Sequence, residues 1–142
     1  MVMRLAPGLV IGGTVEHACA LDRSIGWYIE GVLPLLPFAK RDVVLQLTGV
    51  TDDPRDIGAD VLRTVTLPLC VHFGLREGLS LKTLRRGCPP DGGGAVTLTC
   101  PALRELTPIN LTDEGLVRRV RGVAFSARVS PSVCNRAVDS SR

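Results

Sequence analysis

The sequence predicts an α+β fold in which two helix–strand units lie on one sheet. Two stretches carry this prediction, because each has the pattern of a helix, a turn and a strand: VLPLLPFAKRDVVLQLTGV from Val32 and TLPLCVHFGLREGLSLKTL from Thr66. Composition agrees, since 45% hydrophobic and 22% charged residues are typical of a folded globular domain. Parallel strands joined through helices normally place those helices on one face of the sheet, so we expect a helix layer on one side only.

The first half of the chain supplies the first unit. A strand is expected in GLVIGGTVEHACA, interrupted at Gly12–Gly13, and a helix capped by Ser24 should follow. Apolar residues recur along this helix at helical spacing: Ile25, Tyr28, Ile29, Val32 and Leu36. Pro34 and Pro37 should end or kink it. DVVLQLTGV then predicts a buried strand, and TDDPRDIG a turn.

The second unit begins with a helix from Ala59 to about Phe73, which Gly74 should close in a left-handed conformation. LSLKTLRRG and GAVTLTC predict the next two strands. LTPINL predicts a short strand and LVRRVRGVAFSARV a longer one. Ser130 and Pro131 then suit the start of a third helix.

Residues 84–98, LRRGCPPDGGGAVTL, raise the question of a phosphate-binding loop. Such a loop needs a helix N-terminus directly after its glycines, whereas here a strand is expected. Proline fixes φ and glycine tolerates positive φ, so the segment favours a stiff structural turn. Direct ligand contact remains the alternative. The turn residues are Pro89, Pro90, Gly92, Gly93 and Gly94.

Charge is uneven along the chain. Residues 118–142 contain six arginines and one aspartate, while the net charge of the whole chain is only +3. A basic end suits an anionic partner, although it is equally typical of a solvated face. In a strand, Arg119 and Arg121 would share the solvent face and Val120 the buried face. We take Arg119, Arg121 and Arg128 as candidate RNA or partner contacts.

Other site classes find little support in the sequence. The five cysteines are scattered without a C-x-x-C motif, and neither His17 nor His72 lies at ligand spacing from a cysteine. We therefore expect reduced thiols in an intracellular setting, no metal and no cofactor. The longest apolar run is about eight residues, whereas a membrane-spanning helix needs about 20, so no membrane partner is expected.

Several segments together resemble the RNA 3′-terminal phosphate cyclase family, and more closely its cyclase-like branch of pre-ribosomal RNA processing factors. They are PGLVIGGTVEHAC, RSIGWYIEGVLPLLPFAK, LTGVTDD, LPLCVHFG, LRRGCPPDGGGAVTLTCP, INLTDEG and VRGVAFSARVSPSVCNRAVDSSR. The resemblance implies one cyclase-type repeat, a four-stranded mixed sheet with two helices on one face, over residues 1–112. Residues 113–142 would begin an inserted α/β domain. The chain would be the middle third of a longer protein.

The resemblance also implies departures from the enzymes. Cyclases carry a small-residue turn before the first helix, where this chain has Leu21, Asp22 and Arg23. Their nucleotide-facing glutamine corresponds to Glu30, and a nearby proline to Ile57. A carboxylate is a poor neighbour for a triphosphate, and the family's adenylated histidine lies outside this chain. These differences imply that nucleotide binding has been lost, so no catalytic residue is assigned.

The function implied is that of a non-catalytic ribosome biogenesis factor in the nucleolus of the nucleus. It would support pre-ribosomal RNA cleavage and 18S maturation in the small-subunit processome, near the U3 small nucleolar ribonucleoprotein and a large GTPase. The alternatives are an ATP-dependent RNA 3′-terminal phosphate cyclase, a pre-ribosomal RNA endonuclease, or an α/β interaction module with a basic end. Asp52 and Asp53 do not form a nuclease motif and should hydrogen-bond the backbone of their turn.

Overall fold

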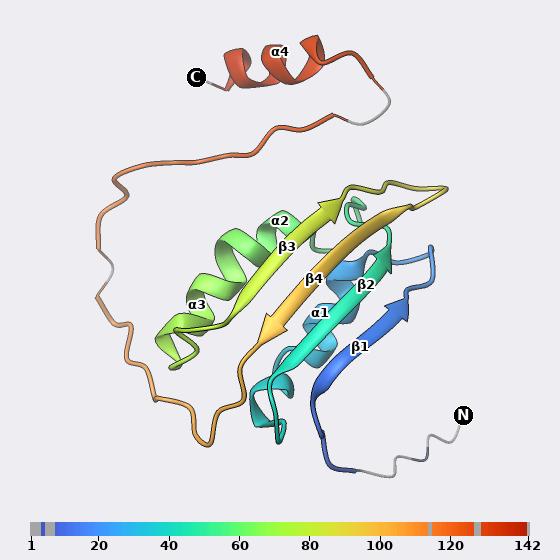
Figure 1. Cartoon of the computed structure of the whole chain (residues 1–142). Coiled ribbons are helices and arrows are strands. Elements are labelled where there is room, and N and C mark those ends of the chain that lie inside the picture. The colour runs from blue at the N-terminus through green and yellow to red at the C-terminus, as the bar shows by residue number, and fades with distance from the viewer. Residues whose placement is uncertain (1–3, 5–7, 114, 127–128, 142) are drawn as a thin grey trace. The chain divides into compact units, whose positions relative to one another are not determined.

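The computed structural model describes residues 4, 8–113, 115–126 and 129–141, and it divides into two compact units (Figure 1). The first unit ends at Ile109 and the second begins at Asn110. No helix in these described ranges is long and apolar enough to cross a membrane.

The first unit contains a four-stranded mixed sheet, which confirms the predicted fold class. Its strands are β1 (Gly13–Ala18), β2 (Val43–Gly49), β3 (Ser80–Arg85) and β4 (Gly94–Cys100), in the spatial order β1-β2-β4-β3. β1 runs parallel to β2, whereas β4 runs antiparallel to both of its neighbours. The first strand begins only at Gly13, because Gly12 before it has a φ of +86°, which interrupts an extended strand.

The helices cover one face of this sheet, as expected (Figure 1). They are α1 (Ile25–Val32), a 3₁₀ turn η1 (Leu36–Phe38), and a continuous helical stretch of α2 (Ala59–Val61), η2 (Leu62–Thr66) and α3 (Leu67–His72). Alternate residues of β2 point into the layer between sheet and helices, so Val43, Leu45 and Leu47 are buried while Gln46 and Thr48 are exposed. Ile25, Ile29, Leu62 and Leu98 complete the centre of this core.

The second helical stretch differs from a regular helix in one place. Predicted as one helix from Ala59 to Phe73, it runs to His72 and includes a π-helical segment, η2, which ends two residues before Pro68. Proline lacks an N–H and its ring clashes with the carbonyl four residues earlier, so a wider turn relieves the clash. Gly74 follows with a φ of +101°, as expected of the closing residue. His72 is exposed.

Two strand predictions are wrong. Residues 106–111 and the described part of 116–129 have no strand structure, although their composition favours strands. A strand is stable only when its backbone groups pair with a neighbour, and within the described residues no strand of the sheet pairs with these segments. Val120, expected to be buried, is 89% exposed.

The second unit contains one helix, α4 (Ser132–Ser140), which starts after Ser130 and Pro131 as predicted. Val133 and Val138 of this helix remain partly exposed. Whether this unit is the beginning of an inserted domain, over residues 113–142, stays a prediction.

Candidate functional site

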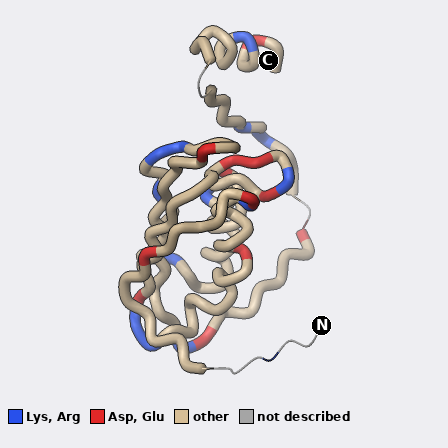
Figure 2. The backbone as a smooth tube through the Cα atoms, turned by 90° about the vertical axis from the view of Figure 1, so that its right-hand side faces the viewer, with Lys and Arg blue, Asp and Glu red and all other residues tan. Residues whose placement is uncertain are grey.

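Three loops meet at the end of the sheet where β1, β2 and β3 finish (Figure 1). They comprise residues 19–24, which lead into α1, residues 50–58, which lead into α2, and residues 86–93, which connect β3 to β4. We call this region the three-loop cluster. Figure 2 shows basic and acidic segments interleaved at this end of the first unit.

Backbone hydrogen bonds join the three loops. Ile25 N donates to Val50 O over 2.7 Å, and Thr51 N donates to Gly87 O over 2.8 Å. The buried Thr51 hydroxyl accepts a hydrogen bond from Gly87 N at 3.0 Å and donates to Asp52 Oδ2 at 2.7 Å. Residues far apart in the sequence are thus held by direct polar contacts.

The glycine-rich loop, residues 86–93, fits against these neighbours because its glycines let the backbone approach closely. Gly92 and Gly93 have φ values of +66° and +78°. A Cβ atom on Gly94, the first residue of β4, would lie 2.6 Å from Thr51 Cγ2 and 2.8 Å from Gly49 O. A strand follows these glycines, in an antiparallel pair with β3. The geometry is therefore that of a tight connection, with no helix N-terminus to receive a phosphate. Pro89 and Pro90 are exposed within the same connection and share a cis peptide bond.

The aspartate-rich loop, residues 50–58, is fixed by ion pairs instead. Arg23 Nε lies 3.0 Å from both carboxylate oxygens of Asp56, and Ser24 N donates to Asp56 Oδ2 over 2.8 Å. The Arg23 hydrogen bond, followed by that of Ser24, lowers the pKa of Asp56. The same guanidinium stacks on Trp27, 4.8 Å from the ring centroid.

A second ion pair lies within this loop. Arg55 Nε and Nη2 each donate to Asp53 over 2.9 Å, and Arg55 N donates to Asp53 Oδ1 over the same distance. These side-chain and backbone hydrogen bonds lower the pKa of Asp53 to about 2. Asp53 therefore hydrogen-bonds its own turn, as predicted. Arg55 also donates to the Asp22 carbonyl over 2.7 Å, which links the loop to the segment before α1.

Arg86 completes the cluster from the glycine-rich loop. Its Nη2 lies 2.6 Å from Asp60 Oδ2, and its Nη1 lies 3.5 Å from Asp52 Oδ2. The arginines of the cluster thus face carboxylates of this same chain. An incoming phosphate would have to compete with those carboxylates, so the arrangement is not a prepared anion site.

The acidic groups form no prepared metal site either. Across the described residues, no group of three or more His, Cys, Asp or Glu side chains is placed to hold a metal ion. Three of the thiols are not activated: burial raises the pKa of Cys19 and Cys70, and raises that of Cys100 to about 11.

The residues predicted as RNA or partner contacts lie elsewhere. Arg119 and Arg121 are exposed in an irregular segment of the second unit, so the expected alternation of strand faces is wrong. Arg128 lies outside the described residues. Their role as contacts stays a prediction. Glu30 is exposed on α1, and the Ile57 carbonyl accepts a hydrogen bond from the Ser24 hydroxyl at 3.0 Å.

The sequence prediction missed the ion pairs of the three-loop cluster. The only available signal was the arginine between aspartates in TDDPRDIG, which predicts local pairing of Arg55. The partner of Asp56 lies 33 residues earlier in the chain, so spacing alone could not identify it.

Comparison with known proteins adds the evolutionary context. The family model described as RNA 3′-terminal phosphate cyclase matches residues 2–141. A mouse protein named RNA 3′-terminal phosphate cyclase-like protein is 50% identical over 137 residues, which are 96% of this chain and 37% of the mouse protein. The rRNA processing proteins of Schizosaccharomyces pombe and Saccharomyces cerevisiae are 49% and 36% identical, each over 96% of this chain. The chain spans 38% of the first and 37% of the second.

Proposed function

Because the chain belongs to the RNA 3′-terminal phosphate cyclase family, we propose that it acts in ribosomal RNA processing as a non-catalytic part of the small-subunit processome. The setting proposed is the nucleolus, close to the U3 small nucleolar ribonucleoprotein and a large GTPase partner. Support comes from the two yeast relatives, whose names describe rRNA processing proteins.

The proposal that the protein is non-catalytic is supported by the contacts of Arg23 and Ser24, in the segment before α1. The cyclases' small-residue turn would present backbone N–H groups to an anion. Here Ser24 N is already occupied by the Asp56 carboxylate, and Arg23 holds that carboxylate in place. The negative charge of the Asp56 carboxylate would repel a negatively charged phosphate at this position.

A chimera of the fission yeast relative tests the processing role. The 138 matched residues of that protein would be replaced by the corresponding residues of this chain, in cells from which the native protein can be depleted. We expect the chimera to restore mature 18S RNA and remove uncleaved precursors on northern blots. A chimera present at native levels that leaves precursors uncleaved would refute the role.

A separate measurement tests the proposal that the protein has no cyclase activity. In a second chimera, the corresponding residues of a genuine cyclase, which supplies the adenylated histidine, would be replaced by this chain. The purified chimera would be incubated with labelled ATP and examined for a covalent adenylate after denaturing electrophoresis. We expect no label, with a genuine cyclase as the positive control. A stable adenylate would instead support the cyclase alternative.

A further inference from the structure

β3 forms one edge of the sheet and pairs with β4 on one side only, within the described residues. Its outer side therefore presents a row of backbone donors and acceptors. Such edges are ready to accept another extended chain, and proteins normally protect them.

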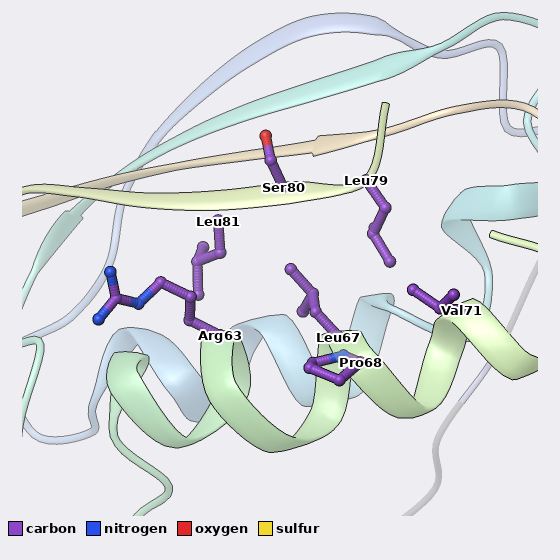
Figure 3. A pocket seen from close by; sticks show the side chains of 7 residues that line it. All are labelled: Arg63, Leu67, Pro68, Val71, Leu79, Ser80 and Leu81. Carbon is purple, nitrogen blue, oxygen red and sulfur yellow. The ribbon is translucent and has the colours of Figure 1, made fainter. Parts of the chain in front are cut away.

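An apolar groove of about 340 Å³ runs beside this edge, between β3 and the helix layer (Figure 3). Leu79 and Leu81 border it on the sheet side, Leu67, Pro68 and Val71 border it on the helix side, and Arg63 lies at one end of the helix side. Figure 3 shows Ser80 directed to the opposite face of the strand. Side chains of an added strand that pointed toward the helices would enter this groove, because strand side chains alternate with a period of two.

The opposite face of the same strand is basic. Lys82 lies opposite Thr97 of β4, and Thr97 lies opposite Gln46 of β2. Gln46 is exposed on the face away from the helices, so Lys82 lies on that face too. A register shift after Thr83 places Arg85 opposite Ala95, on that same face. Both basic side chains are exposed and β3 contains no acidic residue. Two copies of β3 would repel each other if they paired, whereas a strand with acidic side chains on this face would be attracted.

The other edge of the sheet, formed by β1, differs in the charge of its strand and in the lining of the hollow beside it. β1 carries Glu16 and His17, and the His17 ring lies 6.0 Å from that of Tyr28 on α1. The hollow beside this strand is lined mainly by polar residues of β1 and β2: Glu16, His17, Ala18, Gln46 and Thr48. The combination of an apolar groove and a basic edge is thus particular to β3.

We propose that the β3 edge and its groove bind an extended segment of a partner protein as a fifth strand. The segment alternates apolar side chains, which fill the groove, with acidic side chains, which lie beside Lys82 and Arg85. The site is independent of the ribosomal RNA processing role, because it requires only the first unit and a peptide.

The probe is a fluorescent peptide of about six residues, the usual length of a strand, in which valine and glutamate alternate. We expect saturable binding to the chain in fluorescence polarisation. A peptide of the same composition with valines and glutamates in two blocks should not bind, because it cannot present one kind of side chain per face. N-methylation of alternate backbone nitrogens should also abolish binding.

Two matched pairs of variants locate the site. Val71→Ser, in the groove, should raise the Kd roughly fivefold through lost apolar contact, whereas Leu69→Ser on the same helix but outside the groove should leave it unchanged. Lys82→Glu should raise the Kd roughly three- to tenfold, and Lys40→Glu, the only other lysine, should not. Circular dichroism would verify that each variant is folded.

Several results would overturn the proposal: no saturable binding of the alternating peptide, equal binding of the block or N-methylated peptide, or equal effects within either pair of variants. Displacement of the peptide by single-stranded RNA would show a nucleic-acid surface instead. Dimerisation of the chain that Val71→Ser weakens would show that a second copy occupies the edge.

Discussion

The glycine-rich loop and the aspartate-rich loop lie side by side at one end of the sheet, yet different interactions fix them. The glycine-rich loop depends on close backbone approach, including that of Gly94 directly after it. The aspartate-rich loop depends on charged hydrogen bonds that Asp53 and Asp56 accept. Steric fit tolerates no added atom, whereas ion pairs weaken gradually with pH and salt. The two loops should therefore respond differently to mutation and solvent.

The largest effect is expected at Gly94, directly after the glycine-rich loop. Gly94→Ala would bring Cβ within 3 Å of Thr51 Cγ2 and of two backbone atoms, Gly49 O and Gly87 N. Because backbone cannot rotate away as a side chain can, we expect the free energy of unfolding to fall by about 2–4 kcal/mol in urea titrations.

The control for this change is Gly93→Ala, since a Cβ at Gly93 meets nothing within 4 Å. Only its positive φ opposes alanine, so a loss of about 1 kcal/mol is expected. Equal losses at the two positions would show that backbone conformation alone, and not close approach, fixes this loop.

A second change tests whether the aspartate-rich loop also depends on close approach. A Cβ on Gly26 would overlap the Ile57 carbonyl, which belongs to this loop. We expect Gly26→Ala to lower the free energy of unfolding by about 2–3 kcal/mol. Gly31→Ala, in open space on the same helix, should raise it by up to about 1 kcal/mol. If Gly26→Ala proved neutral, ion pairing alone would fix the loop.

Acid should weaken the aspartate-rich loop selectively. The folded-state pKa of Asp53 is lowered to about 2 by Arg55, and that of Asp56 is lowered by Arg23. A lowered folded pKa means that the stabilisation is complete above the unfolded pKa of about 3.9 and is lost as pH falls toward 2.

Urea titrations at successive pH values measure this dependence. The double variant Asp53→Asn and Asp56→Asn should show a flatter stability profile between about pH 4 and pH 2, while Gly94→Ala should keep the native slope. A double variant with the native profile would mean that other carboxylates carry the acid sensitivity.

The smallest effect on stability is expected in the second unit. Arg119 and Arg121 are exposed in an irregular segment, so Arg119→Glu with Arg121→Glu should leave the unfolding midpoint unchanged. If they contact ribosomal RNA, the salt dependence of RNA binding should flatten by about one to two units of log–log slope. If they contact an acidic protein, RNA affinity should persist while co-purification of that protein falls. No change in either would show a solvated face.

These contrasts also explain which features the sequence could predict. The β-strands and the glycine-rich connection depend on local patterns, namely alternation in VVLQLTG and the turn residues around Gly92. The pair of Arg23 and Asp56 depends on a meeting between distant segments, which no local spacing encodes. For residues 116–126 a local pattern gave a wrong prediction. Their composition favours a strand, but a strand also needs a neighbouring strand with which to pair.

The order of the strands has a consequence for synthesis of the chain. β4 is the last of the sheet's four strands in the sequence, yet it lies between β2 and β3 in the sheet. As the chain emerges from the ribosome, β1 and β2 can pair early, but β3 has no neighbour until residues 94–100 follow it. The nascent protein therefore passes through a stage in which helix α3 and β3 are made but not yet joined to the sheet. Chaperones that recognise exposed apolar segments would act at this stage.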